Sequence, residues 1–472
     1  MPSEQVHHIH PLGWETDPQE ERFKISTLDY LSVQSYNSYA LFFRLDDERK
    51  PKTVEILKAG LERTLSQTRH LCGTIEKDPE GGHSYVKKES TVKFVVQWLD
   101  KDGEQYPSID EIEQAHFSAA KLGDLNTWSV PPMTYGEKPE ASPDSSPTVA
   151  AYKANFVRGG CNDIMGWAGL THQLAENCYA TLHRTEYPPW DPANLDLSRL
   201  TKPDPPEDQK VDGPSAPQRH PDQRTGVSLL FHLPKSRAAQ LKTLATPDDR
   251  SWVSTYDAFS AFIMRALTRL HAPVFNPDPS SQLFWSEAVH MRRRFHDPPV
   301  PPRMQGNVMS AAINTTTQIS MLNPTISEII SDWPFPKLAS YIRALTNSVT
   351  QEGLDQILTM VSTVRDKKTL NIRIDSQPPM SILQTDHRDA NITTADFGFA
   401  RPITYRHLLD CVTNGVIIVY PPRAGTGNED EGCEFAIFYE KDRAQSLIED
   451  PEWNEYFEYR GVDAVDAASA DR

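Results

Sequence analysis

A candidate acidic residue, Asp396, stands among apolar neighbours in the motif DFGF at positions 396–399. The tripeptide Asp-Phe-Gly also occurs in protein kinases, so it could point to phosphoryl transfer. A kinase, however, also needs an HRDxxxxN catalytic loop before this motif, and a glycine-rich loop with a strand lysine near the N-terminus. The sequence contains neither, which excludes a kinase. Taken alone, the motif is also consistent with a turn that carries a solvated aspartate.

Other patterns for catalysis are sparse. The chain shows no Ser/His/Asp spacing, nucleophile elbow, P-loop or GxGxxG motif. Its five cysteines are scattered and form no CxxC pair, which argues against a disulfide framework or a zinc site and favours a reducing compartment. Three consecutive arginines, Arg292, Arg293 and Arg294, concentrate positive charge, either as a solvated basic face or as a contact for an anion.

The composition is that of an ordinary globular chain, with 472 residues of which 38% are apolar and 24% charged. The net charge of −17 and the absence of a basic stripe argue against nucleic-acid binding. Residues 1–22 are polar and indicate no signal peptide, and no apolar run approaches the ~20 residues of a membrane span. We expect a cytosolic monomer.

Periodic patterns predict the elements that must position these side chains. Apolar residues recur at helical spacing in Thr53–Gln67, whereas Thr91–Trp98 is β-branched and aromatic, as in a strand. Ser254 and Asp257 resemble a capping box at the start of a helix over Ser254–His271. Further strands are predicted over Val227–Leu233, Val416–Tyr420 and Glu434–Tyr439.

A proline-rich stretch divides these elements into two groups. Residues 201–225 contain six prolines, many charges and too little apolar surface to order by themselves. We therefore predict an N-terminal lobe over residues 1–200, a crossover linker over 201–225, a C-terminal lobe over 226–461 and a disordered tail over 462–472. The alternative is a long surface loop inside a single domain.

The order of several segments adds a family resemblance. WSEAVHMRRRF at 285–295 is followed by PPVPPRMQGNVMSAAI, by PPMSILQTD at 378–386, by the DFGF motif and by VIIVYPPR at 416–423. This order resembles the fungal, trichothecene 3-O-acetyltransferase-like branch of the BAHD acyltransferases. The resemblance implies an α/β fold with two chloramphenicol-acetyltransferase-like lobes, each a mixed sheet flanked by helices. It also implies acyl transfer, in particular of acetyl, from acyl-CoA to a hydroxyl of a fungal secondary metabolite, with no permanently bound cofactor.

The family's catalytic motif, HxxxD, is only half present. In the family its histidine ends a strand and removes the proton of the acceptor hydroxyl, a role worth about 10²–10⁴-fold, while the aspartate is structural. Asp163 fits that aspartate, because Gly166, Ala175 and Glu176 follow at the family's spacings. The histidine position is Gly159, in a Gly-Gly turn that runs almost directly into Asp163. Strands rarely have fewer than about 3 residues, so the strand and its histidine are both expected to be missing.

The DFGF motif corresponds to the family's DFGWG, whose aspartate shapes the CoA tunnel by pairing with an arginine of the segment V-D-x-R-x-R. By this resemblance Asp396 pairs with Arg292, and Arg292 and Arg294 lie where the anionic CoA arrives. His290 replaces the family's acid in that segment. Ala400 replaces the second glycine and would resist a positive φ.

Three interpretations stay open. The chain is a family member whose histidine segment is absent from this sequence or degraded; or it is a non-catalytic relative that binds acyl-CoA or a hydroxylated metabolite; or it is an acyltransferase in which His290 or water replaces the base. His172 is a weaker substitute, because it lies about 200° around the next helix from the apolar stripe. As it stands, the chain is expected to be poorly active or inactive.

Overall fold

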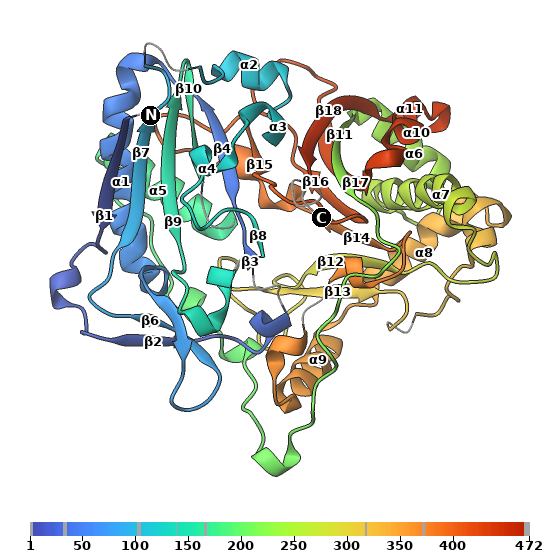
Figure 1. Cartoon of the computed structure of the whole chain (residues 1–472), viewed down its shortest axis with the longest axis horizontal. Helices are drawn as coiled ribbons and strands as arrows, with labels where there is room; N and C mark the ends of the chain where they lie inside the picture. Colours follow the sequence, from blue (N-terminus) through green and yellow to red (C-terminus); the bar gives the residue numbers. More distant parts are fainter. Residues whose placement is uncertain are drawn as a thin grey trace.

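The computed structural model describes residues 3–31, 35–101, 105–137, 139–164, 168–316, 319–370 and 373–466, and of residues 139, 162–164 and 368 only the backbone. Within these ranges the chain forms two lobes, each built on a large mixed sheet with helices packed against it (Figure 1). The predicted two-lobed α/β fold is confirmed. No helix in the described part is long and apolar enough to cross a membrane. None of the five cysteines, all of which are described, forms a disulfide.

The N-terminal lobe contains a six-stranded sheet in the order β1-β7-β9-β10-β4-β15. Neighbouring strands are antiparallel except β7 and β9, which run parallel. Two helices, α1 (Lys50–Gln67) and α5 (Ala168–His183), pack against each other and share an apolar core with the sheet. The strands of this sheet are β1 (Ser3–Ile9), β4 (Tyr39–Arg44), β7 (Val92–Trp98), β9 (Ala151–Val157), β10 (Gly160–Ile164) and β15 (Thr404–His407).

The C-terminal lobe contains a seven-stranded sheet in the order β13-β12-β14-β16-β17-β11-β18. Its long helix α7 (Thr255–Phe275) begins with the predicted capping box, because the Asp257 amide donates to Ser254 Oγ and the Ser254 amide donates to the Asp257 carboxylate. The strands are β11 (Gly226–Leu233), β12 (Trp285–His290), β13 (Met309–Ile313), β14 (Ile382–Asp386), β16 (Val416–Tyr420), β17 (Cys433–Glu440) and β18 (Glu458–Val465). The other helices of this lobe are α6 (Lys235–Ala245), α8 (Phe335–Asn347), α9 (Gln351–Thr363), α10 (Ala444–Ile448) and α11 (Pro451–Tyr456).

Smaller elements complete the N-terminal lobe. A three-stranded sheet lies beside the large one, and a short strand pair lies near the lobe junction. The former consists of β2 (Glu21–Lys24), β5 (Thr74–Lys77) and β6 (His83–Lys87), the latter of β3 (Ser35–Tyr36) and β8 (Gly136–Glu137), and the short helices are α2 (Ile109–Gln114), α3 (Ala119–Leu122) and α4 (Leu125–Trp128).

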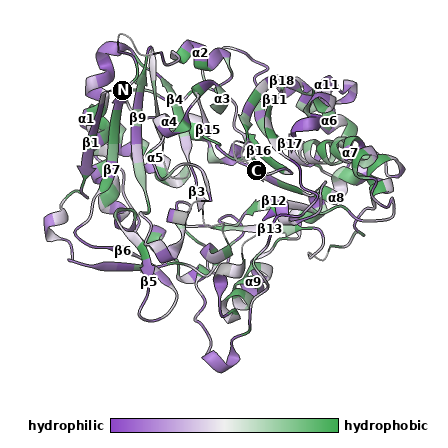
Figure 2. Ribbon diagram, viewed as in Figure 1, coloured by the Kyte–Doolittle hydropathy of each residue, from purple (hydrophilic) through white to green (hydrophobic). Residues whose placement is uncertain are grey.

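Hydropathy follows this layering. Figure 2 shows apolar residues along the strands of both large sheets and polar residues on the outer helix faces. Strand β16 has the bounds predicted from its continuous apolar run, and all eight residues of β17 are buried. Such runs are typical of strands covered on both faces, and these two lie next to each other inside the C-terminal sheet.

A strand from the C-terminal half of the chain belongs to the N-terminal sheet. Although β15 comes late in the sequence, it pairs antiparallel with β4 at the edge of the N-terminal sheet. From the position of the linker alone we had predicted that residues 226–461 form one lobe. That prediction is wrong for β15, which belongs to the sheet of the N-terminal lobe. The tail predicted from residue 462 is also wrong at its start, because β18 continues to Val465; residues 467–472 lie outside the described residues.

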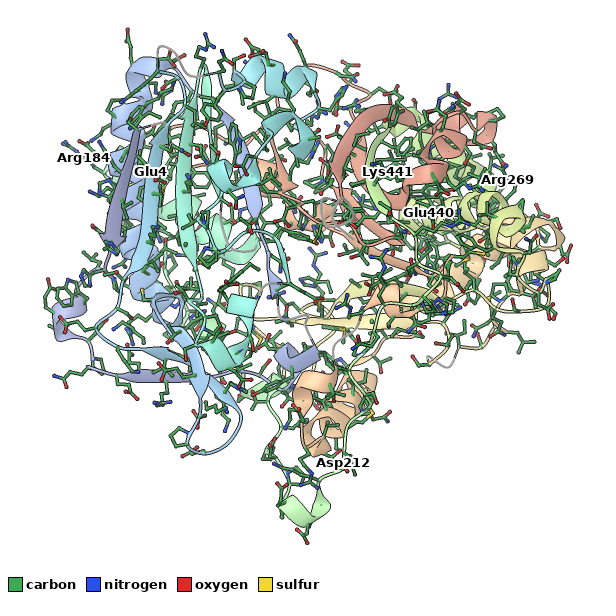
Figure 3. The ribbon with its side chains drawn as sticks, in the orientation of Figure 1. Glu4, Arg184, Asp212, Arg269, Glu440 and Lys441 are labelled. Atoms are coloured by element: carbon green, nitrogen blue, oxygen red, sulfur yellow. The ribbon has the colours of Figure 1, made fainter. Side chains whose placement is uncertain are left out.

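The linker 201–225 forms a projection below the two lobes (Figure 1). A backbone bridge joins Val211 to Val364, just beyond the end of α9. Asp212, labelled in Figure 3 near this projection, pairs with Arg365. The linker thus takes its order from contacts with α9 and the segment after it rather than from an apolar core of its own.

Candidate active site

The hairpin of β9 and β10 corrects one expectation. We had expected the strand before Asp163 to be missing, yet Gly160–Ile164 forms the five-residue strand β10, paired with β9 on one side and β4 on the other. A tight turn makes this possible, because Gly159 has a φ of +75°, which glycine adopts without strain. The strand is built from the motif residues themselves. Position 159 lies in the turn and carries no imidazole.

Helix α5 follows the motif as predicted. Leu170, Leu174 and Cys178 are buried on the face toward α1. Glu176 forms an ion pair with Arg303, which also donates to the Gln173 side chain at 2.6 Å. Glu176 thus ties α5 to the C-terminal lobe. The predicted motif residue Gly166 and the side chain of Asp163 lie outside the described residues.

The aspartate of the DFGF motif has a local partner. Asp396 accepts a hydrogen bond from the Gly398 amide at 2.8 Å and pairs with Arg401 at 3.0 Å. The predicted pair with Arg292 is wrong, because the carboxylate of Asp396 pairs with Arg401 and accepts from the Gly398 amide within its own turn. Ala400 is not at positive φ, so the expected strain of a side chain there is absent.

Arg292 and Arg294 bind backbone carbonyls instead. Arg292 donates to the carbonyls of Met304 and Gly306, and Arg294 to those of Thr346 and Val349. Neither guanidinium has a carboxylate within ion-pair distance among the described residues. Burial lowers the pKa of Arg292 to about 10. Their predicted contact with CoA stays a prediction.

Neither histidine considered as a substitute base lies at the lobe junction in a suitable setting. His172 is half-buried on α5 and its Nε2 lies 2.9 Å from the Ala390 carbonyl. It lines a pocket of about 370 Å³ that also reaches Glu176 and Asp396. His290 lies at the end of β12, where it keeps solvent exposure. Partial desolvation and the charges of Arg292 and Arg293 lower its pKa.

A group of hydrogen-bonded side chains lies where the lobes meet, and it was not predicted from the sequence. His387, just after β14, accepts or donates two ring hydrogen bonds: Nδ1 lies 2.6 Å from the Tyr405 hydroxyl, and Nε2 lies 3.0 Å from Thr385 Oγ1. Beside it, His407 Nδ1 lies 3.1 Å from the Tyr420 hydroxyl. Thr385, His387 and Tyr420 come from the C-terminal lobe, and Tyr405 and His407 from the N-terminal sheet. The His387–Tyr405 and His407–Tyr420 hydrogen bonds therefore cross the junction, whereas the Thr385–His387 bond lies within the C-terminal lobe.

Burial controls the ionisation of this group. It lowers the pKa of His387 to about 4, against the opposing charge of Asp386, and raises the pKa of Tyr405 well above its usual range. At neutral pH the imidazole is therefore uncharged and the phenol protonated. Yet His387 and Tyr39 remain half-buried rather than fully enclosed. The group thus combines desolvated ionisable side chains with some remaining exposure where the lobes meet.

Register places this group near the motif aspartate. Tyr405 and Asp163 both pair with Leu41, from opposite sides of β4. Two strand spacings separate the two backbones, about 10 Å. The sequence alone links His387 and Tyr405 by nothing more than their separation, since Tyr405 is 18 residues beyond His387.

An ion cluster fixes β15 beside the C-terminal sheet. Glu434 of β17 is fully buried and pairs with Arg406 of β15, Arg423 and Arg460. Burial alone would raise the pKa of Glu434, but the charges of Arg406 and Arg423 hold it well below its usual range. Because Arg406 lies between Tyr405 and His407, this cluster sets the position of both.

Comparisons with known proteins agree with this architecture. Residues 35–172 match the trichothecene 3-O-acetyltransferase-like N-terminal domain, and residues 163–453 match the Transferase family. Acetyltransferase FGR3 of Gibberella zeae is 66% identical over 476 residues, which cover 98% of this chain and 95% of that protein.

Solved structures share the fold. The structure of F. graminearum TRI101 complexed with ethyl coenzyme A has a TM-score of 0.75 at 20% identity and covers 94% of this chain and 100% of its own. The same protein complexed with coenzyme A and T-2 mycotoxin gives a TM-score of 0.73 at 20% identity, over 93% and 100%. With a family match across more than half of its length, this chain belongs to the Transferase family of acyltransferases, in the branch whose N-terminal domain is trichothecene 3-O-acetyltransferase-like.

Proposed function

We propose that this chain is an acyl-CoA-dependent O-acetyltransferase that esterifies a hydroxyl of a fungal secondary metabolite. The observation that carries the proposal is the 66% identity to Acetyltransferase FGR3 along nearly the whole of both chains. The two-lobed fold supports it, since several solved structures of this fold hold coenzyme A or ethyl coenzyme A, two of them together with T-2 mycotoxin. The reaction is direct attack of the hydroxyl on the thioester, with no covalent acyl-enzyme.

Positive charge without carboxylate partners supports the CoA part of the proposal. Arg292 and Arg294 bind only neutral carbonyls among the described residues, so their charge is available to the phosphates of CoA. Asp163 and Asp396 take architectural roles in this proposal, Asp396 by closing its own turn. A cytosolic monomer is proposed as well, in keeping with five cysteines that form no disulfide.

Gly159 favours a second candidate, a non-catalytic relative that binds acyl-CoA or a metabolite. The alignment with the Gibberella relative runs over 476 residues, more than the 472 of this chain, so the relative carries residues that this chain lacks. Sequencing the transcript across codons 155–165 tests whether an apolar strand ending in histidine is among them.

One pair of measurements separates the candidates. Binding of acetyl-CoA to the purified chain is measured by calorimetry, and thiol release from acetyl-CoA is followed with a panel of metabolite alcohols. Binding with acceptor-dependent turnover supports the acetyltransferase. Binding without turnover supports the non-catalytic relative. Absence of acetyl-CoA binding rejects the acetyltransferase and the acyl-CoA-binding relative, and leaves only a relative that binds a metabolite.

A further inference from the structure

We propose that Thr385, His387 and Tyr405 form the proton-accepting group of this chain and replace the histidine that Gly159 has displaced. The inference rests on the proposed acetyl transfer and adds the residues that perform its proton step. His387 is the base, Thr385 delivers the proton to it, and Tyr405 is a positioning residue.

The geometry is that of a hydroxyl, a base and an orienting group in series. Thr385 Oγ1 lies 3.0 Å from His387 Nε2, and His387 Nδ1 lies 2.6 Å from the Tyr405 hydroxyl. Both distances are within hydrogen-bond reach, which is the arrangement by which enzymes activate a hydroxyl. The His387 amide also donates to the Val419 carbonyl at 2.9 Å, which fixes the backbone beside β16.

The position fits the reaction. Alternation along β14 places Gln384 in the buried layer against Ser260 of α7, so Thr385 lies on the opposite face of the sheet. Thr385 and His387 are half-buried, whereas Tyr405 is 1% exposed. The Thr385–His387 end of the series therefore keeps some exposure, and the Tyr405 end is enclosed in the N-terminal sheet in the same row as Asp163.

The proton step balances. The acceptor oxygen bonds to the thioester carbonyl carbon, its proton passes to Thr385 Oγ1, and the threonine proton passes to His387 Nε2. Nδ1 keeps its proton and donates to the Tyr405 oxygen. When the tetrahedral intermediate breaks its C–S bond, the proton returns along the same path to the CoA thiolate. The products are the ester and free CoA, and the three side chains end as they began.

The transient imidazolium forms against the burial that lowers the pKa of His387, so the charges around the ring matter. Asp386 favours the protonated form, although it is also paired with Arg388 at 2.6 Å. The rings of Tyr405 and His407 face His387, and Tyr39 and Tyr420 pack against those two rings in turn. All four groups are uncharged at neutral pH, since burial lowers the pKa of the His407 imidazole and raises the pKa of the three phenols.

The first test is His387→Gln, assayed with acetyl-CoA and the best acceptor of the panel. Glutamine retains hydrogen bonding to Thr385 but cannot take up a proton. We expect kcat to fall by about 100-fold or more, while the Kd for acetyl-CoA and the melting temperature stay close to those of the parent. With His387→Ala, added imidazole should restore part of the turnover, which a merely structural role would not allow.

Thr385 and Tyr405 supply the graded variants. Thr385→Val should lose at least about tenfold in kcat, and Thr385→Ser, which keeps the hydroxyl, should recover most of it. Tyr405→Phe should lower kcat less than His387→Gln and leave KM near the parent value.

The chain offers a matched control on its surface. Thr91 Oγ1, just before β7, and His8 Nδ1 of β1 form a threonine–imidazole hydrogen bond at 3.3 Å, outside the junction. His8→Gln and Thr91→Val should leave turnover within about threefold of the parent.

Each remaining outcome decides between the proposals. If the parent turns over and His387→Gln retains its rate, the inference is overturned and the acetyltransferase stands. If the parent binds acetyl-CoA without turnover, the inference is overturned and the non-catalytic relative stands. If the parent does not bind acetyl-CoA, the proposed function fails and the inference fails with it.

Discussion

Tyr405 and Asp163 lie opposite the same residue of β4, Leu41, one on each neighbouring strand. The strand that returns from the C-terminal half thus carries its tyrosine into the row of the sheet that holds the motif aspartate. Through that tyrosine the row gains His387, a histidine of the other lobe. The HxxxD motif lacks its histidine, as the sequence analysis expected. The imidazole of His387 nevertheless reaches the row of the sheet that holds the motif aspartate.

The first prediction concerns the pH dependence of kcat/KM. Burial lowers the pKa of His387 to about 4. The neutral form, which accepts a proton, is therefore present above about pH 5, and the rate should be nearly constant from there to about pH 8. Product formation is followed by chromatography, with folding checked by circular dichroism at each pH. An apparent pKa of about 6 to 7 would contradict the assignment, because it is that of an ordinary, solvated imidazole.

The second prediction concerns the partner of Asp396. A double-mutant cycle of Asp396→Asn with Arg401→Gln should give a coupling of about 0.2–1 kcal/mol, since both side chains keep solvent exposure. The same cycle with Arg292→Gln should give no coupling beyond about 0.5 kcal/mol. Urea unfolding measures both. A clearly larger coupling to Arg292 would restore the pair that the family resemblance implied.

Sequence patterns predict what local chemistry determines. The apolar run of β16 and the Ser254 cap of α7 are found where they were predicted, because each depends on neighbouring residues. Strand β10 was missed, since its stability comes from β9 and β4 on either side rather than from its own five residues.

The candidate site shows the same limit more sharply. Thr385 and His387 lie at the end of β14 in one sheet, and Tyr405 lies on β15 in the other. They come together only because these two strands are neighbours where the lobes meet. The spacing of these residues in the sequence does not predict this contact. The partner of Asp396 was local, at Arg401, and was missed for the opposite reason, because the resemblance directed attention to a distant arginine.

The third prediction concerns Glu434. Glu434→Gln should destabilise the fold by about 3–5 kcal/mol at pH 7, because it leaves Arg406, Arg423 and Arg460 without their shared buried anion. The pKa of Glu434 is depressed in the folded state, so its stabilisation is present above about pH 4.3 and is lost as the pH falls. The difference in the free energy of unfolding between variant and parent should therefore shrink at low pH.

Glu55→Gln is the control for that experiment. Glu55 pairs with Lys52 on the surface of α1, where both side chains are more than half exposed. Its replacement should leave the urea midpoint nearly unchanged at every pH. Equal effects of the two substitutions would show that the buried cluster does not hold the lobes together.

The last prediction concerns Gly159, the position of the family's histidine. Gly159→Ala should destabilise by about 1–2 kcal/mol, because φ is +75° and the added Cβ would lie 2.9 Å from Ile109 Cγ2. Gly123→Ala is the matched control, since Gly123 has φ +78° with nothing within 4 Å of an added Cβ, and it isolates the backbone cost. Gly159→His should destabilise at least as much and raise turnover by no more than about threefold, because position 159 lies in the turn before β10 and not at a strand end facing the junction. A Gly159→His variant that gains about 100-fold would instead show that the lost base acts from this turn.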